Sequence, residues 1–440
     1  MRQNLFHIPD QIGNIPVFGI GLLLVLWVVF SVALISWLAR RQGFNPDTLG
    51  YLPMIVIVTA AILFVLPGLV EQGQGLPIRS YGLMMMLGIV GGVMLAARRA
   101  PAAGIPPDAV YSFAVWLCIG GLAGARLFHI IEYWQTSYLH LHEDGSLDMG
   151  DTLAAMLSFH KGGLVVYGSF IGGMLAFVWY MRRHRLPALA FADLIAPSMM
   201  LGLALGRIGC LLNGCCFGGA CELPWSVTFP QDSPPYMRQL ERGLDLGLQI
   251  LPPSSPSDQP QIVWASPELE QVGFRPGQVI VRVGSLQNPT PQEMLEWIRY
   301  ARSQGSMISI ETALGQEFNL DPAYYSPPPR SLPIGPTQIY SAINAILICL
   351  FLLAFHPYRR RDGMVFGLLI TIYPVTRILL EMIRIDEAPM FGTGLSISQI
   401  ISVVMLASVV LFWVFLLRTS GKKLWAVEHG IAPSIPGDPK

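Results

Sequence analysis

Charged residues are scarce in this chain. They make up 13% of its 440 residues, whereas hydrophobic residues make up 52%. Because a typical soluble domain carries about 25% charged residues, these proportions exclude a large soluble core and indicate a membrane protein with several transmembrane helices. Basic and acidic residues balance at 28 each. The chain therefore lacks the excess of positive charge that would attract nucleic acid.

Cysteine is also rare. The six cysteines are too few to build a disulfide-scaffolded fold in a chain of this length. Cys118 and Cys349 lie in apolar runs, where we interpret them as packing residues. A cleavable signal peptide is not apparent, because the apolar run after Pro16 lacks a preceding basic segment and is long enough to cross a membrane.

Nine stretches are long and apolar enough to cross a bilayer, which takes about 20 residues per helix. They are Val17–Leu38, Leu52–Val70, Ile78–Ala97, Val110–Ile131, Gly163–Met181, Ala188–Leu205, Thr337–Phe355, Met364–Leu380 and Ile397–Leu417. We therefore predict an all-α polytopic membrane protein with about nine transmembrane helices and one long polar segment after the sixth.

Basic clusters follow every odd-numbered stretch. They lie at Arg40–Arg41, Arg98–Arg99, Arg182–Arg185, Arg359–Arg361 and Arg418–Lys423. Because basic loops stay on the cytoplasmic side, this pattern predicts a cytoplasmic C-terminus, including a tail at 421–440, and an N-terminus outside. It also places the long segment Cys210–Pro336 outside.

The long outer segment divides into two parts. Cys210–Pro260 is rich in proline, glycine and serine, which is typical of an irregular head with a linker. The second part predicts strand, helix, strand, turn and strand, at Gln278–Val283, Pro291–Arg302, Met307–Thr312, Gly315 and Glu317–Leu320. This order indicates a small soluble α+β module.

The run Val272–Val283 resembles the central segment of bacterial PDZ domains, with Gln278 in place of the usual aspartate. The resemblance implies a PDZ-like module at about 262–320, within a head at 222–335. Such a module can bind a peptide as an added strand. An alternative of equal weight is that the module binds no peptide and only supports the head or docks on a partner protein.

Apart from the cytoplasmic clusters, several arginines lie within the apolar stretches or at their predicted outer ends. Arg207 lies just after the sixth stretch, at the start of a glycine-rich segment that extends to Gly219. The glycines of this segment predict that the chain leaves the helix there. The others and their neighbours are Arg79, Tyr81, Arg126, Arg377, Glu381 and Arg384. A single arginine can reach the interface or pair with Glu381. The set indicates a phosphate site, because guanidinium groups bind phosphate with paired hydrogen bonds.

Glycines recur at helical spacing in several stretches, among them Gly88, Gly120, Gly124, Gly168 and Gly172. Small residues at such spacing let membrane helices pack closely. We interpret most of these glycines as packing positions.

A group of four cysteines, Cys210, Cys215, Cys216 and Cys221, follows the sixth stretch. No histidines accompany them at zinc-site spacing, so the sequence predicts no metal site. In an oxidising space a disulfide is plausible. A catalytic thiol is a further alternative, although no base is evident beside it.

Five motifs, in order along the chain, resemble those of the prolipoprotein diacylglyceryl transferase family. They are Leu76-Pro-Ile-Arg-Ser-Tyr81-Gly-Leu-Met, Gly124-Ala-Arg126, Gly206-Arg-Ile-Gly-Cys-Leu-Leu-Asn213-Gly, Pro336-Thr-Gln-Ile-Tyr340 and Tyr373-Pro-Val-Thr-Arg377-Ile-Leu-Leu-Glu381-Met-Ile-Arg384. The resemblance implies a transferase core in two parts, 76–221 and 336–420. It leaves out the insert and two extra N-terminal helices at 1–75.

Three positions depart from the family pattern. Tyr167 stands where the family has its essential histidine, and His160 is out of register with that position. Cys210 and Cys215 replace an asparagine and a glutamate of the signature. These departures leave open a divergent paralogue that binds or moves phospholipid, or a membrane-anchored PDZ adaptor. Because the charges cluster at one surface and no inverted repeat is evident, a transporter ranks below the transferase.

The resemblance implies transfer of the diacylglyceryl group of phosphatidylglycerol to the lipobox cysteine of preprolipoproteins in the inner (plasma) membrane, with no metal or organic cofactor. Arg207 and Arg377 are expected to hold the phosphate, with Arg126 nearby. Tyr167 is expected to orient or deprotonate the thiol. The other expected substrate-binding residues are Tyr81, Asn213, Gly218, Tyr340, Glu381 and Arg384.

Overall fold

The computed structural model describes residues 4–43, 52–70, 75–139, 148–158, 163–251, 259–321, 325–384 and 396–418. The chain forms two compact units. The membrane unit comprises residues 2–209, 342–377 and 400–440, and the head unit comprises residues 210–341 and 378–399.

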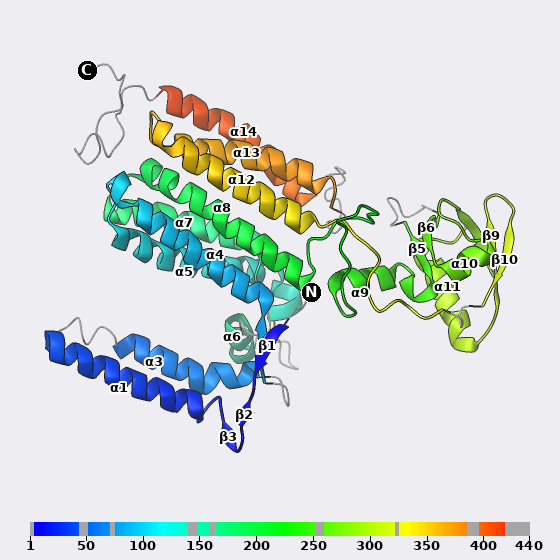
Figure 1. The fold of residues 1–440 in the computed structure, drawn as a ribbon, viewed down its shortest axis with the longest axis horizontal. Helices are drawn as coiled ribbons and strands as arrows, with labels where there is room; N and C mark the ends of the chain where they lie inside the picture. The colour runs from blue at the N-terminus through cyan, green and yellow to red at the C-terminus, as the bar shows by residue number, and fades with distance from the viewer. Residues whose placement is uncertain are drawn as a thin grey trace. The chain divides into compact units, whose positions relative to one another are not determined.

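Helices are the longest elements of the chain (Figure 1). They are α1 (Leu22–Gln42), α3 (Leu52–Ala60), α4 (Ser80–Arg99), α5 (Pro107–Glu132), α7 (Val166–His184), α8 (Ala188–Asn213), α12 (Thr337–Phe355), α13 (Met364–Glu381) and α14 (Ile397–Arg418). Every predicted stretch overlaps one of these helices. Six of them (α4, α5, α8, α12, α13 and α14) are long and apolar enough to cross a membrane. This confirms a multi-pass membrane protein, while the total of nine crossings stays a prediction.

The N-terminal part of the membrane unit adds short elements. A π-helical turn at Ala61–Val65 and a 3-10 turn at Leu66–Leu69 continue α3, where Pro67 cannot donate a backbone hydrogen bond. The strands pair antiparallel as β1 (Asn4–Ile8) with β4 (Leu76–Arg79) and β2 (Gln11–Ile12) with β3 (Ile15–Pro16). The first of these pairs holds the N-terminal segment against the start of α4.

Glycines bring α4 and α8 together in antiparallel orientation. A methyl group added to Gly88 would lie 3.1 Å from the carbonyl oxygen of Gly202. One added to Gly209 would lie 3.2 Å from the ring of Tyr81. Residue numbers fall along α4 as they rise along α8, so the start of α4 lies beside the end of α8.

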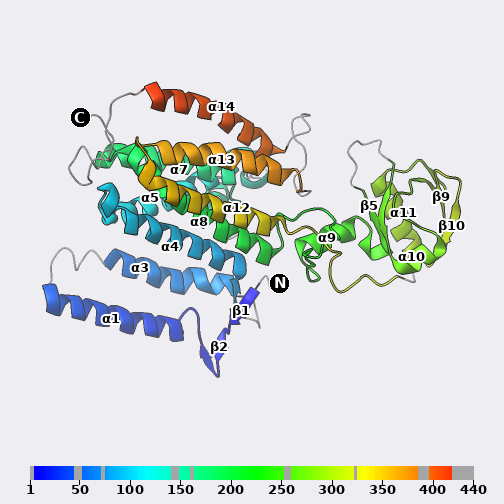
Figure 2. The same ribbon diagram turned by 45° about the horizontal axis from the view of Figure 1, so that its top comes forward.

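The pair α5 and α7 packs in the same way. A methyl group on Gly120 would lie 2.9 Å from the carbonyl oxygen of Gly172. A methyl group on Gly124 would collide with the carbonyl oxygen of Gly168. These contacts confirm the packing role predicted for the glycines. Helix α4 also contacts α5, and Figures 1 and 2 show these four helices grouped together.

A buried carboxylate ties α8 to α13. Asp193 is fully buried, and its two oxygens accept hydrogen bonds from the backbone N–H groups of Gly363 and Phe366, each at 2.8 Å. These groups belong to the first turn of α13 and the residue before it, where backbone donors have no partner within the helix. Arg359 adds an ion pair at 3.7 Å. The starts of α8 and α13 therefore meet, and Figure 1 shows that the two helices run in the same direction.

The end of α8 corrects one prediction. The glycines after Leu205 were expected to break the helix, but α8 continues to Asn213 and the chain leaves it at Gly214, where φ is 80°. A helix satisfies its own backbone groups, so in a membrane a glycine need not end it. Arg207 consequently lies on a helix rather than in a loop.

The head unit contains the predicted α+β module. Its four-stranded antiparallel sheet has the order β10 (Glu317–Leu320), β9 (Ile308–Thr312), β7 (Ile280–Val283), β8 (Leu286–Gln287). Three helices belong to this unit, α9 (Pro234–Glu241), α10 (Pro267–Val272) and α11 (Pro291–Gln304). A capping box between Thr290 and Glu293 starts α11, and Gly315 forms the predicted turn with φ of 73°. The likeness to PDZ domains stays a prediction.

The segment before this module is more ordered than predicted. β5 (Leu248–Ile250) pairs with β6 (Ile262–Ala265), and Leu248 and Ile250 are buried in the same core as β7, β9 and α11. The module thus begins before residue 262, in the part that was predicted to be irregular. A strand of three residues is too short for alternation to reveal it.

The helix contacts predict a specific loss of stability. Replacing Gly124 with Ala places a methyl group against the backbone of α7, and overpacking of this kind costs about 1–3 kcal/mol. We expect Gly124→Ala to lower the thermal unfolding temperature of the detergent-solubilised protein. Gly82→Ala is the matched control, because nothing lies within 4 Å of that added methyl group. Equal unfolding temperatures for the two variants would contradict the packing role.

Candidate active site

Arg207 and Arg377 lie at the same level of the membrane unit. The reference point is the Asp193 anchor, where α8 meets the residue that precedes α13. Arg207 follows Asp193 by 14 residues, and Arg377 follows Gly363 by the same number. At about 1.5 Å per helical residue, both lie about 21 Å from the anchor. Arg377 is buried and Arg207 is half-buried.

Tyr81 lies at the same end of the unit. It is the second residue of α4, and its ring contacts the α8 backbone at Gly209, two residues after Arg207. Its side chain is 37% exposed. The antiparallel pairing of α4 and α8 thus brings the tyrosine of the first motif beside the arginine of the third.

Arg126 binds backbone carbonyl groups. It is 5% exposed, and its guanidinium donates to carbonyl oxygens of Met156 at 2.9 Å, Ala155 at 2.7 Å, Ser158 at 3.1 Å and Gly163 at 3.0 Å. Three of these carbonyls lie at the C-terminal end of α6 (Met149–Leu157), where the last carbonyls of a helix lack partners. The fourth belongs to the segment that leads into α7. Arg126 therefore joins α5, α6 and the start of α7.

Tyr167 lies next to this junction. It is the second residue of α7 and is 38% exposed. The segment before it is fixed by the Arg126 bond to Gly163 and by a hydrogen bond from the N–H of Val165 to the carbonyl of Ala125 at 3.3 Å. The predicted residues Arg126 and Tyr167 thus lie at the same end of the α5–α7 pair. His160 lies outside the described residues.

His129 is a residue that the sequence analysis missed. It lies one turn after Arg126 on α5, and a methyl group on Gly163 would be 2.9 Å from its ring. Its Nδ1 atom hydrogen-bonds the hydroxyl of Tyr138 at 2.8 Å, and its ring stacks on Tyr133. The i,i+3 spacing from Arg126 is the signal that could have found it.

The remaining predicted residues lie in the head unit. Asn213 ends α8. The backbone of Gly218 pairs with Arg384, and a methyl group there would lie 2.8 Å from the carbonyl oxygen of Gly335. Tyr340 accepts a hydrogen bond from Trp225 at 2.6 Å.

Glu381 and Arg384 form an ion pair in the head unit. Their side chains are 3.1 Å apart, and each is only 3% exposed. A buried charge pair of this kind orients its members, because separating them would leave an uncompensated charge. The predicted pairing of the glutamate with an arginine is therefore present for Arg384.

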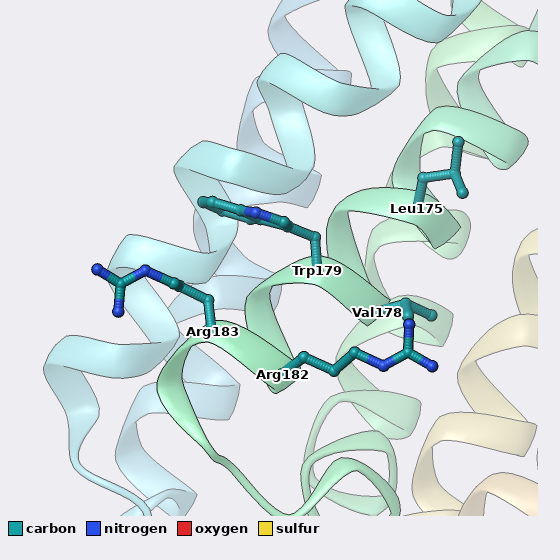
Figure 3. Close-up of a pocket in the computed structure, with 5 residues that line it drawn as sticks. All are labelled: Leu175, Val178, Trp179, Arg182 and Arg183. Carbon is teal, nitrogen blue, oxygen red and sulfur yellow. The ribbon is translucent and has the colours of Figure 1, made fainter.

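A shallow apolar pocket lies at the other end of α7 (Figure 3). Leu175, Val178, Trp179, Arg182 and Arg183 line it, and the two arginines point in opposite directions from the last turn. Arg182 follows Tyr167 by 15 residues, which places it about 22 Å along the helix. Tryptophan with basic residues at a helix end is typical of a membrane–water interface. We therefore assign this pocket to the interface and not to the site of Tyr167.

Comparison with known proteins decides the family. A family model for prolipoprotein diacylglyceryl transferase matches residues 67–415. The chain belongs to this family. A phosphatidylglycerol--prolipoprotein diacylglyceryl transferase of Rhodopirellula baltica is 34% identical over 93% of this chain and 88% of that protein. One from Synechococcus elongatus is 34% identical over 41% of this chain and 59% of that protein.

Family membership confirms the resemblance that the five motifs indicated. The match begins after α1 and α3, at residue 67. It includes the motif residues of both units, and it extends across the head.

The contacts of Arg126 predict a positioning role. Lysine cannot replace the N–H donors of the Arg126 guanidinium, which lie on three nitrogen atoms, because an ammonium group offers only three N–H groups from a single atom. We expect Arg126→Lys to speed hydrogen–deuterium exchange at residues 152–158 and 163–167, measured by mass spectrometry. Arg98→Lys, a change at an exposed residue of α4, should leave exchange there unchanged. Unaltered exchange in Arg126→Lys would refute the role.

Proposed function

We propose that this protein transfers the diacylglyceryl group of phosphatidylglycerol to the lipobox cysteine thiol of preprolipoproteins. Membership of the family supports the proposal, and so do the names of its relatives. The observation that carries it is the equal level of Arg207 and Arg377 along α8 and α13. Two guanidinium groups at one level of a membrane protein suit a phospholipid phosphate.

The reaction is a displacement at the glyceryl carbon next to the phosphate ester. The thiolate of the lipobox cysteine attacks that carbon, a carbon–sulfur bond forms, and the carbon–oxygen bond to phosphate breaks. The electron pair leaves with the phosphate oxygen, so the departing glycerol phosphate gains negative charge. Arg207 and Arg377 stabilise that charge, which fixed cations achieve best in a site shielded from water.

The thiol must lose a proton, since the thiolate is the nucleophile. We assign the hydroxyl of Tyr167 to orienting or deprotonating the thiol. His129 is a second candidate for the proton acceptor, because it contacts the segment that leads to Tyr167.

We assign supporting roles to the remaining predicted residues of each unit. Tyr81, Asn213 and Tyr340 supply neutral hydrogen bonds to substrate. Glu381 orients Arg384, its partner in the buried ion pair. Gly218 allows a close backbone approach, since a side chain there has no room. Arg126 acts as a positioning residue, because its donors bind the carbonyl groups around the start of α7.

We also propose an orientation in the cell's inner (plasma) membrane. The N-terminus and the segment 210–336 face outside, and the C-terminus lies in the cytoplasm. The basic residues at the ends of α4, α7 and α14 support this orientation. It places Tyr81, Tyr167, Arg207 and Arg377 on the outer side.

The α+β module is proposed to bind a peptide or protein partner. Its sheet has two edge strands, β10 and β8, and an extended peptide can add to such an edge.

Deleting residues 244–321 separates partner binding from catalysis. If the module is accessory, the shortened protein still transfers the diacylglyceryl group. Loss of transfer would show that the module takes part in the reaction.

Removing either phosphate-binding arginine tests the transferase proposal. We expect Arg207→Ala and Arg377→Ala each to lower transfer by about 100-fold or more, as loss of a transition-state donor does. The assay combines phosphatidylglycerol with a lipobox peptide and detects the added mass on the peptide cysteine. Arg183→Ala is the matched control, because it removes an arginine at the opposite end of α7. Full activity of both site variants would refute the phosphate role.

The proton acceptor is tested by Tyr167→Phe and His129→Gln. We expect loss of the acceptor to lower transfer by about 100-fold and to remove one limb of the pH–rate profile. Tyr111→Phe, at an exposed tyrosine of α5, is the control. A normal rate and pH profile in Tyr167→Phe would exclude proton transfer by Tyr167, and the same result in His129→Gln would exclude His129.

A further inference from the structure

Three cysteines come together where α8 ends. Cys210 lies in the last turn of α8, and Cys215 and Cys216 follow that helix closely. Their three sulfur atoms all lie within 4.8 Å of one another. Cys210 is buried and the other two are half-buried. All six cysteines of the chain have free thiols, so no disulfide uses any of the three.

The backbone turns sharply to bring these sulfur atoms together. Gly214 has a φ of 80°, and its N–H and that of Cys215 donate to the carbonyl of Cys210 at 2.9 and 3.1 Å. Cys216 then takes a φ of 60°. This left-handed region costs a residue with a side chain about 1–2 kcal/mol. Such strain persists where the surroundings hold it, and it is concentrated at functional sites.

Two residues at the start of α12 hold the turn. Gln338 donates from Nε2 to the carbonyl of Cys215 at 2.8 Å, and Thr337 donates from Oγ1 to that of Cys216 at 2.7 Å. Both donors are almost fully buried. The carbonyl groups of the two cysteines are therefore engaged by α12 while their sulfur atoms meet that of Cys210. This arrangement makes the three thiols a preformed group.

We propose that Cys210, Cys215 and Cys216 bind one zinc-class cation, with Zn²⁺ as the expected ion. In tetrahedral zinc sites the Zn–S distance is about 2.3 Å, so sulfur ligands lie about 3.8 Å apart. The three sulfur atoms need to approach by about 1 Å at most to reach that geometry. Each thiol loses one proton, so three protons are released per ion, and a water molecule completes the coordination.

A disulfide is the competing use of these residues. It would join two sulfur atoms at about 2.05 Å and would leave the third unused. Three sulfur atoms that converge on one point fit a cation better. The sequence predicted no metal site because no histidines accompany the cysteines. The turn at Gly214 nevertheless brings the three sulfur atoms together, which their spacing in the sequence does not reveal. The ion would fasten the end of α8 to the turn that α12 holds.

Metal analysis of the full-length protein tests the proposal. We expect the detergent-purified protein, prepared without chelator and incubated with Zn²⁺, to hold about one zinc ion per chain after desalting. Replacement by Co²⁺ should give the near-ultraviolet charge-transfer absorption of cobalt–thiolate bonds. Cys210→Ser, Cys215→Ser and Cys216→Ser should each weaken binding at least about tenfold. Cys221→Ser and Cys118→Ser, which lie outside the trio, should bind as the wild type does.

Thiol alkylation of the wild-type protein gives a test that needs no variant. With Zn²⁺ bound, the three cysteines should resist alkylation and should become reactive after chelation, while exposed Cys118 reacts in both states. Peptide mass mapping reads each site. A disulfide between two of the three in untreated protein would overturn the proposal. Zinc retained at full affinity by all three serine variants, or the same alkylation of the trio with and without zinc, would overturn it as well.

Discussion

The hydrogen bonds of Asp193 fix the geometry on which the candidate site depends. A carboxylate buried in a membrane helix is costly unless it is fully paired. Asp193 satisfies this condition by binding two N–H groups at the start of α13, so α8 and α13 have one stable register. A slip of a single residue would move an arginine by about 1.5 Å and turn it by about 100° around the helix. The level of Arg207 against Arg377 therefore depends on a contact 14 residues away.

Close helix contacts through glycine supply the second constraint. The α4–α8 contact at Gly209 sets Tyr81 beside the end of α8, and the α5–α7 contact at Gly124 sets Tyr167 beside the end of α5. Because helices with larger side chains would stand further apart, these glycines determine which end residues can meet. The Asp193 bonds and the α4–α8 contact place Tyr81, Arg207 and Arg377 at one end of their three helices, and the α5–α7 contact places Tyr167 beside the end of α5.

Hydrophobic pattern was sufficient to predict the helices and the order of elements in the α+β module, because a membrane and a small core both impose a strong periodicity. It was insufficient where partners are distant in the sequence. The partners of Arg126 lie about 30 residues away, and those of Asp193 about 170 residues away. The continuation of α8 through Gly206 and Gly209 was missed because glycine was treated as it behaves in water. The convergence of the cysteine sulfurs depends on two residues with positive φ, which no spacing rule reveals.

Arg126 and Arg207 show why a motif alone does not assign a role. Both are arginines near the C-terminal ends of apolar helices, and both belong to motifs that resemble those of the family. The guanidinium of Arg126 donates to four backbone carbonyl groups of the protein itself, so these hydrogen bonds hold protein segments in position. Helix register brings Arg207 and Arg377 to the same level of the membrane unit, where we propose that they bind a phosphate. The acceptors that the fold supplies to Arg126 indicate a positioning role, whereas the role proposed for Arg207 depends on the register of α8 and α13.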